Sequence, residues 1–417
     1  MNNFFDDLEC REVKSRENEL MISLPELIKK TQKASGWSEI LSGVNPNDIN
    51  SREALSKLPI TRKSKLNSIQ KKNLPFGGLN TTSVKNLSRI FVSPGPIFDP
   101  EGKSEDWWRF ARPMYALGVR EGDLIHNCFS YHFTPAGFMA EGGAKKLNCP
   151  VIPAGIGQTE LQVEVIENLK PIVYVGTPSF LKIIIEKAHQ IGANISSLKF
   201  ALVGAEALPP SLRKWFIDSG MERVLQTYGT ADIGNIAYET MSNESVNPGM
   251  IIDENLIIEI VRPGTGDPLP TGEVGEVVIT SFNKDYPLIR FATGDMSSIL
   301  SGISPCGRTN VRIKGWLGRA DQTTKVRGMF IHPSQVAQII KQNPFIIKAK
   351  FIITGEMSQD KMTMYCEVSD TQKNNNQSEM IKKSIREITK LRSSVTLIKK
   401  GALPNDGIVI EDKRSYD

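Results

Sequence analysis

Three segments of this 417-residue chain, each with glycine at a predicted turn, contain residue types that could bind a nucleotide. The first, ALVGAEALPPS at 201–211, has the pattern of an apolar strand, a turn and a helix that begins at a proline. In open α/β sheets, ligands bind beyond the carboxyl ends of strands, where helix N-termini offer free N–H groups to anions. The turn formed by Gly204, Ala205 and Glu206 is therefore a candidate ligand contact, although an ordinary turn has the same pattern.

The second segment, QTYGTADIG at 226–234, places an aromatic ring, a hydroxyl and a carboxylate within a few positions of one another. The ring of Tyr228 could stack on a planar base, and the hydroxyl of Thr230 could bond a phosphate oxygen. The carboxylate of Asp232 could hold Mg²⁺, which prefers oxygen ligands. This combination suits a nucleotide and a metal ion side by side.

The third segment, RFATGD at 290–295, is followed by the glycine-rich run GWLGRADQTTKVRG at 315–328. The carboxylate of Asp295 could accept hydrogen bonds from two neighbouring hydroxyls, as those of a ribose. Each of the three segments alone also fits a common turn. Their order and their spacing along the chain make the combination more specific than any one of them.

The stretch from 106 to 240 contains the elements that would position these segments. Runs with helical spacing, such as PSFLKIIIEKAHQIG, alternate with short apolar runs, such as DLIHNCFS, PIVYVGT and LKFALVG. Alternation of helices with short buried strands favours βαβ units and a parallel sheet covered on both faces. The sequence therefore predicts an α/β protein.

The regions on either side differ from this core. Residues 1–88 read as helical, 89–240 as the α/β core, and 241–320 as a β-rich subdomain with antiparallel strands. A polar segment near 320 suits a hinge, and 321–417 read as a small α+β domain. Within that domain, the polar tract SDTQKNNNQSE is predicted to be a loop.

The composition narrows the class of protein. The chain has 51 basic and 46 acidic residues, so its formal charge of +5 gives no support for nucleic acid or a membrane surface as a partner. Its 5 cysteines are scattered without a CxxC, which argues against a disulfide framework and a zinc site. The charged N-terminus does not read as a signal peptide, and no apolar run is long enough to span a membrane. We therefore expect a cytoplasmic protein.

Together, the three segments resemble the adenylate-forming enzymes, the superfamily of acyl- and aryl-CoA synthetases, and most closely the phenylacetate–CoA ligases. The resemblance covers roughly residues 50–417. It includes LPITRKSKL upstream, the segment from GDLIHNCFSYHF to NCPVIP in the middle, and GRADQTTKVRGMFIHPSQV at the domain junction. It implies a large N-terminal domain over 1–320 and a small mobile C-terminal domain over 321–417, with Asp321 as the hinge.

The resemblance also implies roles for individual residues. Gly204, Ala205 and Glu206 match the turn that contacts adenine, and Tyr228, Gly229 and Thr230 match the segment that contacts adenine and the α-phosphate. Asp232 stands where the family usually has a Glu for Mg²⁺. The remaining nucleotide contacts implied are Ser93 in the phosphate loop, Asp295 at the ribose and Arg319 at the ribose or phosphate; among these residues, Thr230, Asp232 and Arg319 are the expected catalytic groups.

The acyl pocket is expected from the middle segment and the turn after it. The residues that match are Tyr131, His132, Phe133, Ala136, Gly137 and Gly155. Their mixture of aromatic rings and small residues suits a flat apolar or aromatic carboxylate. For His126 and His132, a hydrogen-bonded histidine at a strand end is the alternative to a role in ligand binding.

In the family reaction, a carboxylic acid and ATP give an acyl-adenylate, which then passes its acyl group to coenzyme A. The resemblance thus implies ATP/AMP, Mg²⁺ and coenzyme A as cofactors and a small carboxylic acid as substrate, and it leaves room for a homodimer. Two of the family's features are missing from this chain. VSPGPIFDP stands where a Ser/Thr/Gly-rich phosphate loop is usual, and Ile408 follows Gly407 where a lysine is usual.

These departures leave three hypotheses. The first is a CoA ligase with a reshaped phosphate loop, in which Mg²⁺ and Arg319 compensate. The second is an enzyme that does part of the chemistry, such as handling a preformed acyl-adenylate or moving an acyl group between carriers. The third is a non-catalytic protein that binds a nucleotide or CoA. Pro94 and Pro96 each lack an N–H, and Asp99 adds negative charge near the expected polyphosphate, so ATP-dependent adenylation is the uncertain step.

Overall fold

A computed structural model describes residues 4–262, 265–317, 319–320, 324–327, 329–331, 333–355, 360–369, 374–404 and 408–414. Contacts within the chain divide it into two compact units, Met1–Gly318 and Arg319–Asp417. This division lies just before the boundary predicted from the sequence. The predicted hinge residue, Asp321, lies outside the described residues.

The helices of the first unit are amphipathic, and each buries its apolar side. The best defined is α8, where the Thr177 hydroxyl accepts a hydrogen bond from the Phe180 N–H, Pro178 occupies the first turn and Gly192 ends the helix with a positive φ. The α-helices of this unit are α1 Val13–Thr31, α2 Ser35–Ile40, α3 Arg52–Ser56, α4 Leu66–Lys72, α5 Ala111–Leu117, α6 Ala136–Lys146, α7 Thr159–Leu169, α8 Pro178–Ile191 and α9 Pro210–Asp218.

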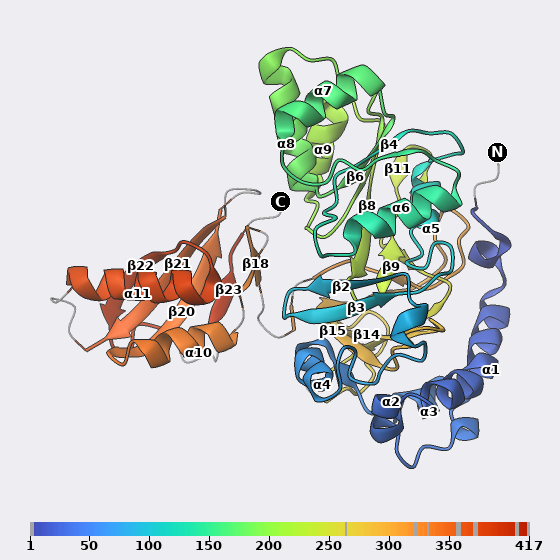
Figure 1. Cartoon of the computed structure of the whole chain (residues 1–417), viewed down its shortest axis with the longest axis horizontal. Coiled ribbons are helices and arrows are strands. Elements are labelled where there is room, and N and C mark those ends of the chain that lie inside the picture. Colours follow the sequence, from blue (N-terminus) through green and yellow to red (C-terminus); the bar gives the residue numbers. More distant parts are fainter. Residues whose placement is uncertain are drawn as a thin grey trace. The chain divides into compact units, whose positions relative to one another are not determined.

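The central sheet has nine strands in the order β16-β17-β12-β9-β8-β7-β6-β4-β5. Its parallel part is β4 Ile125–Asn127, β5 Val151–Ile152, β6 Val173–Gly176, β7 Phe200–Val203 and β8 Arg223–Thr230. Its antiparallel part is β9 Gly234–Tyr238, β12 Met250–Ile252, β16 Ile299–Leu300 and β17 Arg312–Ile313. Helices α7, α8 and α9 lie on one side of the parallel strands, and α5 and α6 lie on the other (Figure 1). The predicted α/β core is confirmed.

A second sheet and two hairpins complete the first unit. The second sheet has the order β1-β15-β14-β13, formed by β1 Thr61–Arg62, β13 Leu256–Val261, β14 Gly275–Ser281 and β15 Phe291–Ser297. In it β1 runs parallel to β15, and the other pairs are antiparallel, as expected for this region. The hairpins are β2 Arg89–Ser93 with β3 Ile97–Glu101 and β10 Met241–Ser242 with β11 Ser245–Val246.

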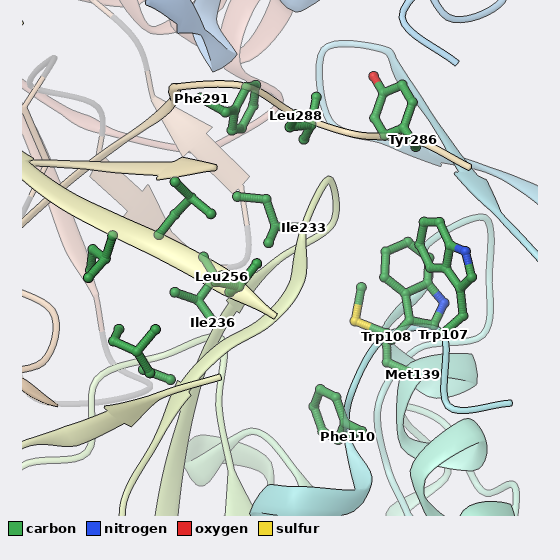
Figure 2. Packing of buried hydrophobic residues seen from close by; sticks show 14 of the residues in the cluster. Trp107, Trp108, Phe110, Met139, Ile233, Ile236, Leu256, Tyr286, Leu288 and Phe291 are labelled. Atoms are coloured by element: carbon green, nitrogen blue, oxygen red, sulfur yellow. The ribbon is translucent and has the colours of Figure 1, made fainter. Parts of the chain in front are cut away.

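The main hydrophobic core of the first unit extends beneath both sheets. Trp107 and Trp108 pack edge to face with ring centroids 4.3 Å apart, and Met139 of α6 lies beside them (Figure 2). Ile233 follows β8 of the central sheet and Phe291 is the first residue of β15 in the second sheet, yet both belong to the same buried cluster (Figure 2). This shared packing holds the end of β8 and the start of β15 in one rigid body, which fixes the segments expected to bind the nucleotide.

The second unit is a small α+β domain with its own core. Its elements are the hairpin β18 Thr324–Val326 and β19 Met329–Ile331, the helices α10 Pro333–Gln342 and α11 Asn374–Thr389, and the strands β20 Ile346–Thr354, β21 Lys361–Val368, β22 Ser394–Lys399 and β23 Ile410–Asp412. Helix α11 begins at Asn374, so the loop predicted for SDTQKNNNQSE is wrong for its second half. Ile381 and Ile385 of α11 are buried, and this apolar stripe outweighs the low helix propensity of the asparagines.

Among the described residues, no helix combines the length and the apolar character needed to cross a bilayer.

Candidate functional site

The second and third of the predicted segments, 226–234 and 290–295, meet where the two sheets of the first unit adjoin. The Tyr228 hydroxyl, at the end of β8, donates a hydrogen bond to Oδ2 of Asp295 on β15 at 2.9 Å. The indole N–H of Trp316 donates to the other oxygen, Oδ1, at 3.1 Å. Two neutral donors therefore fix the orientation of the Asp295 carboxylate.

The first segment lies alongside β8. The Gly204 N–H donates to the carbonyl of Gly176 at 3.1 Å, and the Gln226 side chain donates to the carbonyl of Glu206 at 2.9 Å. Between them, Ala205 is exposed and adopts a positive φ of 64°, so the turn projects from the carboxyl end of the sheet. Because β7 and β8 are parallel neighbours, the first two segments lie at the same edge of the sheet, and the Tyr228–Asp295 hydrogen bond brings the third segment to them.

The residues after Tyr228 form a tight turn. A side chain at Gly229 would meet the carbonyl oxygen of Gly234 at 2.4 Å, so only glycine fits there. The Thr230 hydroxyl accepts a hydrogen bond from the Ile233 N–H at 3.2 Å. This bond orients Thr230 within the turn and leaves its O–H hydrogen for another acceptor, which is compatible with the predicted phosphate contact.

Lys63 is a site residue that the sequence reading missed. Its ammonium group forms an ion pair with Oδ2 of Asp232, whose side chain is fully buried, while 25% of the Lys63 side chain is exposed. Burial opposes the charge on Lys63, but the carboxylates of Asp232, Asp99 and Asp295 outweigh it and raise the pKa of this lysine. Lys63 stands among other basic residues in LPITRKSKL, so nothing in its local sequence distinguishes it.

The segment predicted as a phosphate loop is the β2–β3 hairpin, with a turn at 94–96. Asp99 is in strand β3, opposite Phe91, and it is completely buried rather than exposed in a loop. Burial raises the pKa of Asp99 well above its usual value; the charge of Asp232 adds to the rise, and Lys63 opposes it. The expected negative charge at the polyphosphate position is thereby disfavoured.

Helix α4 holds this hairpin by side-chain hydrogen bonds. Asn67 donates to the carbonyls of Gly95 at 3.0 Å and Pro96 at 2.6 Å. Gln70 accepts from the Phe98 N–H and donates to the Phe98 carbonyl, both at 2.8 Å. Ser93 is buried, and its hydroxyl lies 3.5 Å from the carbonyl of Ile97, across the hairpin. These hydrogen bonds anchor the hairpin along its strands and at its turn. The contact of Ser93 with a nucleotide stays a prediction.

Three of the predicted acyl-pocket residues pack on one another. A side-chain carbon at Gly137 would meet the Tyr131 ring at 2.9 Å, and one at Gly155 would meet the same ring at 3.8 Å. Asn127 at the end of β4 donates to the Tyr131 hydroxyl at 2.7 Å and to the carbonyl of Gly137 at 2.9 Å. The glycines thus make room for the tyrosine ring, and Asn127 holds it.

The other residues of the predicted pocket are more exposed. His132 and Phe133 are exposed and stack edge to face, with centroids 4.8 Å apart, while Ala136 begins α6. The Phe133 carbonyl accepts a hydrogen bond from the Val92 N–H at 2.9 Å, which joins this segment to the β2–β3 hairpin. His126 is fully buried with Nε2 2.9 Å from Gln162, which favours the structural alternative for this histidine.

The predicted residues near the C-terminus belong to the second unit. Arg319 is the first residue of that unit, and its predicted contact with ribose or phosphate stays a prediction. Ile408 is 38% exposed and, like Lys413, lies next to the edge strand β23. Lys413 pairs with Glu411 at 3.4 Å, so it already has a carboxylate partner within its own unit.

The residues at Asp232 do not fit a resident Mg²⁺. The Lys63 ammonium holds one Asp232 oxygen, and no group of three or more His, Cys, Asp or Glu side chains suited to a metal occurs in the part of the chain that the structure describes. Mg²⁺ usually needs several oxygen ligands in octahedral geometry. The position expected for the metal is thus beside a positive charge that the protein itself supplies.

A surface hollow of about 750 Å³ lies elsewhere, at the start of α7 and along α8. None of the predicted site residues lines it. The hollow is therefore separate from the edge of the sheet where the three segments meet.

Comparisons with known proteins identify the family of this chain. Residues 109–283 match the family described as AMP-binding enzyme. The phenylacetate–coenzyme A ligase of Thermus thermophilus is 30% identical over 341 residues, which cover 79% of this chain and 75% of that protein. The chain belongs to the phenylacetate–CoA ligase family. The Escherichia coli phenylacetate–coenzyme A ligase is 31% identical over 310 residues, covering 72% of this chain and 69% of that protein.

Solved structures extend the phenylacetate–CoA ligase likeness to the fold of the whole chain. The crystal structure of 2-hydroxyisobutyryl-CoA ligase in complex with 2-HIB-AMP and CoA superposes with a TM-score of 0.83 at 20% identity. The match covers 100% of this chain and 93% of that one. At this identity the likeness concerns the fold, and it confirms the predicted α/β class.

Proposed function

We propose that the protein is a phenylacetate–CoA ligase-like, AMP-forming synthetase that joins a small acyl or aryl carboxylic acid to coenzyme A. The observation that carries this proposal is the Asp295 carboxylate, oriented by Tyr228 and Trp316 at the edge of the sheet where the three segments meet. A carboxylate held in a fixed orientation beside these turns is suited to accept hydrogen bonds from the hydroxyls of a ribose. Family membership supports the same conclusion.

ATP is proposed to lie across the carboxyl ends of β7 and β8. In this arrangement the turn at Gly204–Glu206 and the ring of Tyr228 contact adenine, and Asp295 accepts from the ribose hydroxyls. Thr230 donates to the α-phosphate through the hydrogen that its bond from Ile233 leaves free. These roles rest on the resemblance, and the observed hydrogen bonds support them by fixing each side chain in place.

The first half-reaction is proposed to depend on Lys63. A carboxylate oxygen of the acid attacks the α-phosphorus of ATP, and the bond to the pyrophosphate oxygen breaks. Negative charge grows on the pyrophosphate, and the family's phosphate loop and C-terminal lysine are not available here to neutralise it. The Lys63 ammonium is partly exposed and already oriented by Asp232, so it supplies a fixed positive charge without reorganisation.

In the second half-reaction, the thiolate of coenzyme A attacks the carbonyl carbon of the acyl-adenylate, and AMP leaves. We propose that the acyl group lies against the Tyr131 ring, which Gly137 and Gly155 accommodate, during this step. Arg319 and the hinge at Asp321 stay predictions for this step. Mg²⁺ is proposed to enter with the ATP phosphates as part of the substrate rather than as a resident ion.

A specific observation also favours a second candidate, transfer from a preformed acyl-adenylate to coenzyme A. The hairpin at the phosphate-loop position has prolines at 94 and 96, and Asn67 holds the carbonyls of its turn. Gly95 is then the one residue of that turn with an N–H to offer a phosphate. An acyl-adenylate has no pyrophosphate, so its binding would not depend on this loop.

One experiment separates the two candidates. Purified protein is incubated with ATP, Mg²⁺, coenzyme A and a panel of aryl and short acyl acids, and AMP is measured. In parallel, a synthetic acyl-adenylate is supplied with coenzyme A alone, and thioester is measured. AMP formation with any acid supports the synthetase; thioester only from the adenylate supports the second candidate. If the protein binds AMP but forms no product in either reaction, both candidate functions are contradicted.

Two further expectations stay predictions. A homodimer is tested by light scattering of the purified chain, and a cytoplasmic location by fractionation of cells that produce it.

A further inference from the structure

Three carboxylate oxygens beside the proposed adenylation site are buried without a hydrogen bond among the described residues. They are both oxygens of Asp99 and Oδ1 of Asp232. Asp99 has no exposed surface, and Asp232 is 3% exposed. The Ser93 hydroxyl is the hydrogen-bond donor that favours an ionised Asp99, and it does not offset complete burial, so an additional positive charge or a proton has to balance the pair.

The groups that face Asp99 come from four surrounding elements. Lys63 and Asp232 interact with it electrostatically, and the Ser93 hydroxyl faces it from β2. The Tyr286 hydroxyl, ahead of β15, is also buried without a partner and is within electrostatic reach of Asp99 and Asp232. Among the residues that the structure describes, Lys63 is the positive charge that acts on Asp99, and it already pairs with Asp232.

We propose that Asp99 is a positioning residue of the adenylation site, and that its carboxyl group is protonated and neutral when the site is empty. Because Asp99 is then neutral, Asp232 carries the negative charge that faces the Lys63 ammonium. The group formed by Asp99, Asp232 and Lys63 is then neutral rather than negative, so it adds no repulsion against the anionic phosphates of ATP. A carboxylic acid of this kind takes the position of the family's phosphate loop and acts through Lys63 without touching the phosphates.

Two observations agree with a proton on Asp99. Burial, together with the charge of Asp232, raises the pKa of Asp99 well above its usual value. The hairpin that carries Asp99 is held to α4 by Gln70 on both sides of Phe98, so the side chain cannot turn outward to reach water without breaking these bonds. The proton is therefore retained by the fold as well as by the charge balance.

The first test is the stability of Asp99→Asn, which is neutral at every pH and nearly the same size. A carboxyl group whose pKa is higher in the folded state contributes to stability at low pH and loses that contribution as pH rises through the folded pKa. The melting temperature of Asp99→Asn, relative to the unmodified protein, should therefore increase between pH 5.5 and 8.5, reaching about 3 °C at the upper end. A difference that stays constant over this range, or a variant that melts lower at every pH, would overturn the proposal.

Glu276 provides a matched control, because it is a buried carboxylate in the same unit that has a positive partner. Its Oε2 lies 2.5 Å from a guanidinium nitrogen of Arg62, the residue next to Lys63. Glu276→Gln leaves Arg62 without its charge partner and should lower the melting temperature at pH 8.5, opposite to Asp99→Asn. If both substitutions lower the melting temperature at pH 8.5, Asp99 also behaves as a paired, ionised carboxylate.

The second test is kinetic and rests on the proposed function. The KM for ATP is measured from pH 7.5 to 9.5 for the unmodified protein and for Asp99→Asn. ATP and Lys63 are the same in both proteins, so the KM of the unmodified protein divided by that of Asp99→Asn reports on Asp99 alone. This ratio should rise by about fivefold with increasing pH, because Asp99 becomes negatively charged in the unmodified protein. A ratio independent of pH would overturn the role in ATP binding. If the unmodified protein forms no AMP, the proposed function fails, and the melting experiment still decides the protonation of Asp99.

Discussion

The Lys63 ammonium and the buried Asp232 carboxylate form an ion pair although 169 positions separate them in the sequence. Lys63 follows β1, which pairs in parallel with β15, and Asp232 follows β8 of the central sheet. The pair therefore links the two sheets directly beside the turn proposed to bind the α-phosphate. A positive charge is fixed at this junction before any ligand arrives.

Lys63→Met should reduce pyrophosphate release about 100-fold, because it removes a charge that stabilises the leaving group. It should also destabilise the protein by about 2–3 kcal/mol, since Asp232 keeps a buried charge without its partner. Steady-state pyrophosphate release and denaturant unfolding measure the two effects. Lys65→Met is the matched control, since Lys65 is exposed and two residues away. Equal rates for Lys63→Met and Lys65→Met would contradict the role of Lys63.

Tyr228→Phe should weaken AMP binding about fivefold while leaving the ring that contacts adenine. The substitution removes the hydrogen bond to Oδ2 of Asp295 and keeps the one from Trp316 to Oδ1, so the carboxylate is less firmly oriented. The rise in melting temperature caused by saturating AMP measures the change. Tyr228→Ala removes the ring as well and should abolish the rise; an unchanged rise in both variants would show that AMP binds elsewhere.

Gly137→Ala should alter the preference for the acid without altering the KM for ATP. Its new methyl group would lie 2.9 Å from the Tyr131 ring and displace it, so the KM for the preferred acid should rise about tenfold. Gly142→Ala is the control in the same helix, because the nearest atom to its methyl group is 3.7 Å away. If both substitutions act alike, the effect belongs to α6 as a whole and not to the acyl pocket.

Gln70→Leu should loosen the β2–β3 hairpin. The substitution leaves the Phe98 N–H and carbonyl without partners, and we expect a loss of about 2 kcal/mol in the free energy of unfolding. Lys71→Leu, at the next and exposed position of α4, is the control. Urea unfolding measures both, and a loss shared equally by the control would indicate an effect on α4 rather than on the hairpin.

Much of the fold could be predicted from the sequence because its signals are local. Short apolar runs alternating with helical spacing indicate βαβ units wherever they occur, and the turns at 204–206 and 228–232 follow strands in the printed order. Helix α11 was the exception: its polar first turn gives no local helix signal, and burial of Ile381 and Ile385 decides its extent.

The chemistry of the site depended more on contacts between distant residues. In the sequence, Asp99 is an acid in a proline-rich loop, and Lys63 is one lysine in a basic run. Only strand pairing, which turns the loop into a hairpin and buries Asp99, makes the two part of one cluster with Asp232.

The sequence by itself determined the family, the order of the elements and the segments proposed to bind the nucleotide, because these depend on residue types and on spacing along the chain. The tertiary structure decided which charges face one another. Burial and the distance between charges set the pKa of a carboxyl group and the partner of a lysine, and neither quantity is encoded in neighbouring residues. The missing phosphate loop is visible in the sequence, whereas the lysine proposed to compensate for it is visible only in the fold.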